Sequence, residues 1–268
     1  MPFALILQMT TLDFPHAAVA FGSAFLAGVI NSVAGGGTLV SFPTLIWLGL
    51  PSVTANATST VAIWPATAGG MFGYRRELST ASRKMLRLVI PSLIGGIGGA
   101  LLLRMTPPAV FDLLVPFLIL FATLLFMAQE PVQRILRTSE AARHESNRWF
   151  AGAMLFQLMV ALYGGYFGAG IGILMLAAMS ILGLTDIHQM NGLKNFFGGS
   201  INGIAAVYFI WADMVRWPFV VVMVIGAVLG GYGGAGVARK IGRTAVRRVV
   251  IAIGLGMAVS LFAKLLNK

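Results

Sequence analysis

The chain has 268 residues, of which 58% are hydrophobic and only 10% are charged, and its mean hydropathy is +0.88. This composition excludes an ordinary water-soluble domain, in which about 25% of residues are charged. The formal net charge of +11 comes from charges too few and too segregated to indicate a nucleic-acid-binding surface. Cysteine is absent, which excludes disulfides and Cys-based metal sites.

Long uncharged stretches predict membrane-spanning helices. Residues 14–74 contain no Asp, Glu, Lys or Arg, and one spanning helix needs about 20 apolar residues. No alternation typical of strands is evident, which disfavours an outer-membrane barrel. No Lys or Arg precedes the first apolar stretch, so we expect no cleaved signal peptide.

The apolar stretches and their breaks predict ten helices in two halves. The expected helices of the first half are 14–33, 38–49, 53–74, 87–104 and 109–128. A basic linker with Pro131 and alternating Arg and Glu is expected at 129–148. The expected helices of the second half are 149–167, 171–183, 188–210, 215–238 and 245–265. The predicted fold class is therefore an all-α polytopic membrane protein with transmembrane repeats at 1–128 and 149–268.

Matching motifs indicate that the two halves are duplicates. Residues 95–104 read GGIGGALLLR, and residues 230–239, which lie 135 positions later, read GGYGGAGVAR. The tripeptide LGL recurs at 48–50 and 182–184, each time after a Gly-rich break. Asn56 and Asn191 also lie 135 positions apart. Four marks in one order at nearly one offset favour duplication over chance similarity.

Basic residues predict the orientation of the chain in the membrane. Segments 75–87, 129–148 and 239–248 hold 14 of the 19 Lys and Arg residues, and the positive-inside rule makes all three cytoplasmic. The corresponding connections of the opposite halves, 211–216 and 104–112, hold one basic residue each. Both termini are then outside and the second half is inserted upside down. Inverted repeats of this kind are typical of secondary transporters.

The Gly-rich breaks before the two short helices are the predicted centre of function. A helix of about 12 residues is roughly 18 Å long, too short to span the membrane, so each break should reach towards the middle of the membrane. Backbone N–H groups and half-helix N-termini at such breaks suit an anion. The alternative is that these glycines only permit close helix packing. Packing is the interpretation we favour for 95–104 and 230–239, either within the chain or across a homodimer.

Polar residues beside the breaks extend this candidate site. Amides and hydroxyls can bind an oxyanion without a fixed charge, although Ser and Thr can instead bond the carbonyl four residues earlier. Lys194 is the only charged residue expected within helix 188–210. A charge within a span indicates function by default, and the alternative is that Lys194 snorkels to the interface. All eight acidic residues lie in connections or near helix ends, which disfavours a cationic substrate.

Catalytic chemistry finds no support in the sequence. His16, His144 and His188 are too dispersed to suggest a metal cluster. No nucleophile–base arrangement, P-loop or dinucleotide-binding fingerprint is present. We therefore expect no enzymatic activity, no cofactor and no metal centre.

Several of these motifs resemble one known family. Residues 27–39 read AGVINSVAGGGTL and are similar to the first signature of the sulfite exporter TauE/SafE family; LGLP at 48–51 and NATS at 56–59 follow as they do there. Residues 164–172, GGYFGAGIG, resemble its second signature. The resemblance covers nearly the whole chain. It implies a permease of the bacterial inner membrane that moves small sulfur-containing anions, such as sulfite or organosulfonates, outward.

The sequence thus predicts a secondary transporter that binds a small anion between its halves and works by alternating access within the lipid bilayer. The residues expected to line its site come from both halves: Asn31, Gly35, Gly36, Gly37, Thr38, Asn56, Thr58 and Ser59 from the first, and Gly168, Gly170, Gly172, Asn191, Lys194 and Asn195 from the second. Two alternatives remain: a passive anion channel, and a non-transporting membrane partner that scaffolds an enzyme. In the scaffold, side chains would fill the Gly breaks.

Overall fold

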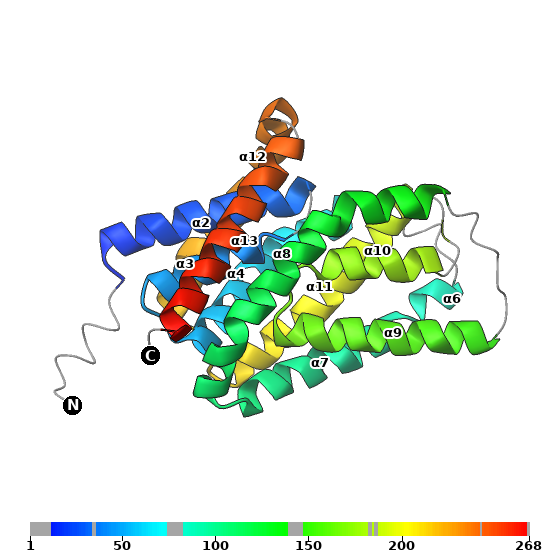
Figure 1. The fold of residues 1–268 in the computed structure, drawn as a ribbon, viewed down its shortest axis with the longest axis horizontal. Coiled ribbons are helices and arrows are strands. Elements are labelled where there is room, and N and C mark those ends of the chain that lie inside the picture. Colours follow the sequence, from blue (N-terminus) through cyan, green and yellow to red (C-terminus); the bar gives the residue numbers. More distant parts are fainter. Residues whose placement is uncertain are drawn as a thin grey trace.

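The computed structural model describes residues 12–33, 36–73, 83–138, 147–181, 184, 187–241 and 243–266. Within these residues every regular element is an α-helix (Figure 1). The helices of the first half are α2 (Phe14–Val33), α3 (Thr38–Trp47), α4 (Ser52–Gly73), the short α6 (Arg83–Leu86), α7 (Val89–Met105) and α8 (Pro108–Thr138). Those of the second are α9 (Asn147–Tyr166), α10 (Ile171–Ile181), α11 (Ile187–Trp211), α12 (Trp217–Ile241) and α13 (Arg243–Leu266).

The basic segments contain more helix than the sequence predicts. Helix α8 continues to Thr138 through the first half of the expected linker, and α12 and α13 extend into segment 239–248 until only residue 242 separates them. The helix bounds expected at 128, 238 and 245 therefore differ from the observed ones. Arg, Glu, Gln and Leu are good helix formers, so a spanning helix can continue into water at little cost. Part of segment 75–87 and residues 139–146 lie outside the described residues.

Helices α2 and α3 form a hairpin. Asp13 and His16 at the start of α2 line the same groove as residues 48–51, which follow α3. A methyl group added at Gly37, where α3 begins, would lie 2.4 Å from the carbonyl oxygen of Ala27. The short helix therefore starts beside the body of α2 and returns towards the end from which α2 came.

Two helix pairs form the closest contacts in the bundle: α2 packs against α12, and α7 against α9. Glycines make both approaches possible. A methyl group added at Gly230 would lie 2.0 Å from the carbonyl oxygen of Phe25, and one added at Gly99 would lie 2.2 Å from that of Leu162. These members of the two repeated Gly motifs therefore serve helix packing, as predicted, and they do so within the chain, one of the two alternatives that the sequence left open.

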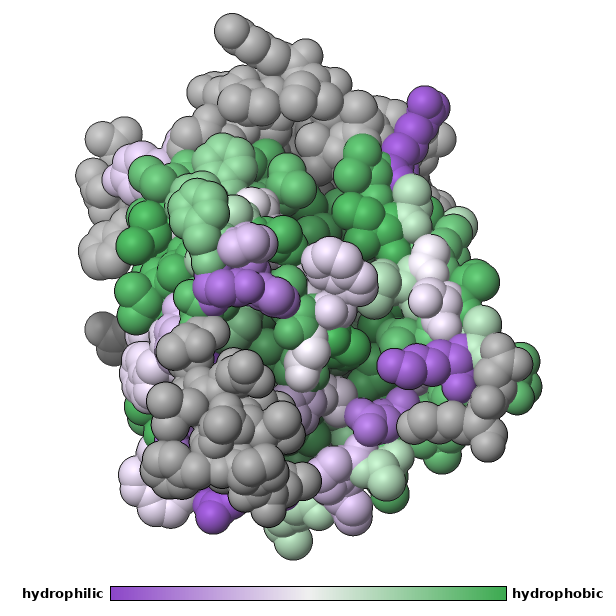
Figure 2. Space-filling model, turned by 90° about the vertical axis from the view of Figure 1, so that its left-hand side faces the viewer, coloured by the Kyte–Doolittle hydropathy of each residue, from purple (hydrophilic) through white to green (hydrophobic). Residues whose placement is uncertain are grey.

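The outer surface of the helices suits a lipid environment. By length and composition, three helices among the described residues can cross a membrane, at Phe14–Asn31, Pro108–Ala128 and Arg247–Leu266, and shorter apolar helices accompany them. Seen from the left of Figure 1, the surface has broad hydrophobic areas with polar residues between them (Figure 2). Trp47, Trp211 and Trp217 are exposed at helix ends, the position that indole rings favour at a membrane interface.

Candidate functional site

The first helix break is held by a side chain of α2. The backbone N–H of Gly37 donates a hydrogen bond to Oδ1 of Asn31 (2.8 Å), so this amide ties the residue before α3 to α2 across the break. Gly36 has φ +93°, a backbone conformation that favours glycine. Thr38 begins α3, and Gly35 lies outside the described residues. This bond uses the acceptor of Asn31 and leaves its N–H donors for other partners.

The second break, at residues 167–170, is held by α9. The hydroxyl of Tyr163 donates to the carbonyl of Ala169 (2.7 Å), while Gly168 and Gly170 adopt φ +79° and +80°. Tyr163 is a partner that the sequence reasoning missed, because an aromatic residue in an apolar helix gives no signal of a bond to a break.

Lys194 lies against the start of the short helix α10. A methyl group added at Gly172 would lie 3.2 Å from Cδ of Lys194, so the aliphatic stem of the lysine covers the first turn of α10. Asn191 lies three residues before Lys194 and four residues before Asn195 on α11, so it shares a face of the helix with both. The side chains of Asn191, Lys194 and Asn195 are all partly buried. An ammonium group beside a helix N-terminus adds positive charge to the positive end of the helix dipole. This part of the site favours a bound anion.

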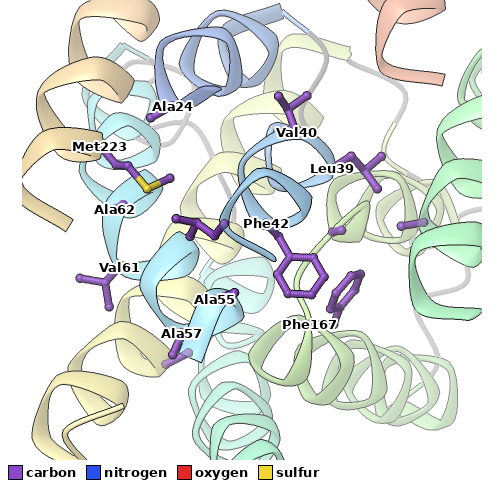
Figure 3. Packing of buried hydrophobic residues seen from close by; sticks show 14 of the residues in the cluster. Ala24, Leu39, Val40, Phe42, Ala55, Ala57, Val61, Ala62, Phe167 and Met223 are labelled. Carbon is purple, nitrogen blue, oxygen red and sulfur yellow. The ribbon is translucent and has the colours of Figure 1, made fainter. Parts of the chain in front are cut away.

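The two breaks meet at α8, a helix that the sequence reasoning did not connect with the site. A methyl group added at Gly36 would lie 2.8 Å from Cε2 of Phe126, and one added at Gly170 would lie 3.5 Å from the carbonyl oxygen of Ala122. One turn of α8 therefore covers both breaks. Phe42 of α3 meets Phe167 of the second break edge to face, with ring centroids 5.3 Å apart (Figure 3).

Helix α4 joins the halves through Asn56. Its Nδ2 donates to the carbonyl of Tyr166 (2.9 Å), the last residue of α9 before the second break. Ser59 is fully buried one turn further along, and its hydroxyl lies 2.7 Å from that of Ser41 in α3. Ser41 is another residue that the sequence reasoning missed. Asn56 and Ser59 thus tie α4 to both short-helix breaks.

Thr58 faces a different part of the molecule. Its hydroxyl accepts the backbone N–H of Arg216 (3.1 Å), which lies in the connection between α11 and α12. Two residues along an α-helix correspond to a rotation of about 200°, so Thr58 points away from the face of Asn56. The structure brings thirteen of the predicted residues into described positions, but it does not bring the Thr58 hydroxyl to the breaks.

A groove of about 580 Å³ lies away from the breaks. It is open at the end where α2 and α12 begin, and its polar lining includes Asp13, His16, Asp213 and Arg216. None of the fourteen predicted site residues lines this groove. No group of three or more His, Cys, Asp or Glu residues that could hold a metal ion occurs in the described part of the chain.

The all-helical fold and its apolar helices are those of a polytopic membrane protein. The sequence profile described as Sulfite exporter TauE/SafE matches residues 20–261. The chain belongs to this family, which the motifs of its two halves had indicated. Because this is a family of transporters, membership agrees with the expectation of a non-enzyme.

Curated relatives cover nearly the whole chain. A "Probable membrane transporter protein ORF9" of Sinorhizobium sp. is 26% identical over 95% of this chain and 95% of its own length. A "Probable membrane transporter protein" of Haemophilus influenzae is 25% identical over 90% of this chain and 92% of its own. The "Probable membrane transporter protein YfcA" of Escherichia coli K12 is 25% identical over 91% and 88%. No solved structure matches the chain.

Proposed function

We propose that this membrane transporter moves a small sulfur-containing oxyanion, such as sulfite or an organosulfonate, out of a bacterial cell by alternating access. The observation that carries the proposal is the position of Lys194 against the first turn of α10, beside a break with two left-handed glycines. Positive charge and a helix N-terminus there favour an anion over a neutral or cationic substrate. The sulfur chemistry rests on the family.

An inverted repeat in the bacterial inner membrane is part of the proposal. Helices α2 and α9, which begin the two halves, run in opposite directions along the long axis (Figure 1). The contacts between helices support the same relation. Helix α2 packs on α12, and α9, the counterpart of α2, packs on α7, the counterpart of α12. We place segments 75–87, 129–148 and 239–248 in the cytoplasm by their charge.

Alternating access requires α8 to move relative to the breaks. Phe126 lies on Gly36, and the same turn of α8 approaches Gly170, so the breaks are covered in this conformation. Filled breaks are also what the scaffold alternative predicts. A transporter differs from a scaffold in that α8 must move off the breaks during the transport cycle. A rocking motion of one half against the other would lift α8 from at least one break.

The proposal is tested by transport in liposomes. Purified full-length protein should exchange labelled sulfite or sulfoacetate against unlabelled substrate, with saturation, and Lys194→Ala should lower the initial rate at least about 10-fold because it removes a positive charge from the site. Lys264→Ala is the matched control, since Lys264 is exposed near the end of α13.

Three results would contradict the proposal. Conductance without saturation or counterflow would indicate a passive channel. No movement of any oxyanion would favour the scaffold. Equal rates in Lys194→Ala and the unmodified protein would remove the assigned role of this lysine.

A further inference from the structure

Asn56 is a buried polar residue whose hydrogen bonding the fold leaves incomplete. Its side chain is 1% exposed, and Nδ2 donates to the carbonyl of Tyr166. A carbonyl can only accept, so this bond fixes which side of the amide carries the oxygen. Within the described structure the buried Oδ1 has no hydrogen-bond partner. A buried acceptor without a partner is costly and needs an explanation, such as a bound ion.

Two serines add further acceptors beside Asn56. Ser41 donates to the carbonyl of Gly37 (3.3 Å), and its oxygen lies 2.7 Å from that of Ser59. Either hydroxyl of this pair can be the donor, and in both cases each oxygen keeps a lone pair for a ligand. Ser59 follows Asn56 by three residues on α4, which places both on one face. The cluster therefore presents three side-chain oxygens with lone pairs to a ligand, of which Oδ1 of Asn56 has no partner in the described structure.

Acceptors of this kind suit a cation. All three oxygens are neutral, whereas divalent ions usually take carboxylates, so the set favours a monovalent ion. Tyr166 ends α9, and the carbonyl end of a helix is the negative end of its dipole. Interrupted helices in transporters use such ends to hold coupling ions.

We propose that Oδ1 of Asn56 and the hydroxyl oxygens of Ser59 and Ser41 bind Na⁺ alongside the oxyanion. The site itself stands on these contacts, and its role in coupling rests on the proposed function. Tyr166 and Gly172 flank the second break, so the ion near Tyr166 and Lys194 over Gly172 provide positive charge at both flanks. Neutralising a buried oxyanion from both sides lowers the cost of carrying it through the membrane.

The first experiment measures ion binding in the absence of substrate. Thermal unfolding of the purified full-length protein is compared in NaCl, KCl and choline chloride at equal ionic strength. We expect a melting temperature about 2–4 °C higher in NaCl than in choline chloride, because ligand binding stabilises the folded state. Asn56→Ala should remove this difference. Equal melting temperatures of the unmodified protein in all three salts would overturn the proposal.

Gln157→Ala is the matched control, because Gln157 is also a carboxamide that is 1% exposed and donates one hydrogen bond, to Ser92 in the α7–α9 pair. It should lower the melting temperature in every salt and leave the increase in NaCl unchanged.

If Asn56→Ala does not fold, Ser59→Ala provides the test, since it retains the bond from Asn56 to Tyr166. It should raise the NaCl concentration for half-maximal stabilisation several-fold, and an unchanged value would contradict the proposed ion site.

A second experiment separates the ion site from the transported substrate. In liposomes, sulfite transport should follow an imposed Na⁺ gradient, and Asn56→Ala should lose this dependence. Stabilisation by Na⁺ without any oxyanion transport would end the proposed function and leave the ion site standing. Oxyanion transport without any response to Na⁺ would overturn the ion site alone, and would point to a water or a protonated substrate at Oδ1.

Discussion

Arg247 belongs to a basic segment that the sequence marks as cytoplasmic, and its guanidinium also has a structural partner. Its Nη2 donates to the carbonyl of Met127 in α8 (2.7 Å). Pro131 lies four residues after Met127 and has no N–H, so the bond that would normally close this turn of the helix cannot form. The arginine of α13 therefore supplies the donor that the proline lacks, and α8 continues past Pro131.

We predict that Arg247→Met lowers the melting temperature by about 2–4 °C, because the Met127 carbonyl loses its donor. Arg248→Met is the control, since Arg248 is exposed. Pro131→Ala restores an N–H to α8, so Arg247→Met should cost less in that background than in the unmodified chain. Equal losses in both backgrounds, measured by thermal unfolding in detergent, would show that Arg247 acts in another way.

Helix packing at the element scale depends on a few glycines whose neighbours are backbone atoms. At Gly230 the nearest atom to an added methyl group is the Phe25 carbonyl oxygen at 2.0 Å, whereas a methyl group at Gly256 meets nothing within 4 Å. We predict that Gly230→Ala destabilises the protein by about 1–3 kcal/mol, because α12 must move away from α2. Gly256→Ala should be neutral or stabilising, since alanine is the better helix former. Equal unfolding temperatures of the two variants would contradict this packing.

Which face of a helix meets its neighbours was harder to predict than where the helix begins and ends. The pattern of charges and breaks placed α4 at 53–74, and it is found at Ser52–Gly73, whereas α8 was expected to end at 128 and continues to Thr138. Lipid is as apolar as leucine, so a helix that is apolar all round does not reveal its packed face. The sequence therefore grouped Thr58 with Asn56, although the two side chains point to different sides of α4. For the same reason the covering role of Phe126 could not be predicted.

At the scale of the whole molecule, the contacts between helices repeat from one half to the other. Helix α4 packs on α12 and its equivalent α11 packs on α7; α3 contacts α13 and its equivalent α10 contacts α8. Each half thus places its short helix against the last helix of the other. The motifs 135 residues apart predict a duplication, but they could not predict this exchange of partners, because sequence similarity carries no information about which surfaces meet.

The orientation of the halves is open to a direct test, because the chain contains no cysteine. We predict that a membrane-impermeant maleimide labels Pro107→Cys on intact cells, and labels His144→Cys only after the cells are opened. Pro107 is exposed in the connection between α7 and α8, and His144 lies in the basic linker, which the positive-inside rule assigns to the cytoplasm. Asn267→Cys, beyond the end of α13, should behave like Pro107→Cys if each half crosses the membrane an odd number of times.

Labelling of His144→Cys on intact cells would reverse the assigned orientation. Labelling of Asn267→Cys only in opened cells, with Pro107→Cys accessible outside, would mean an odd number of crossings after Pro107. With the linker inside, the second half would then cross an even number of times, which would exclude the inverted repeat.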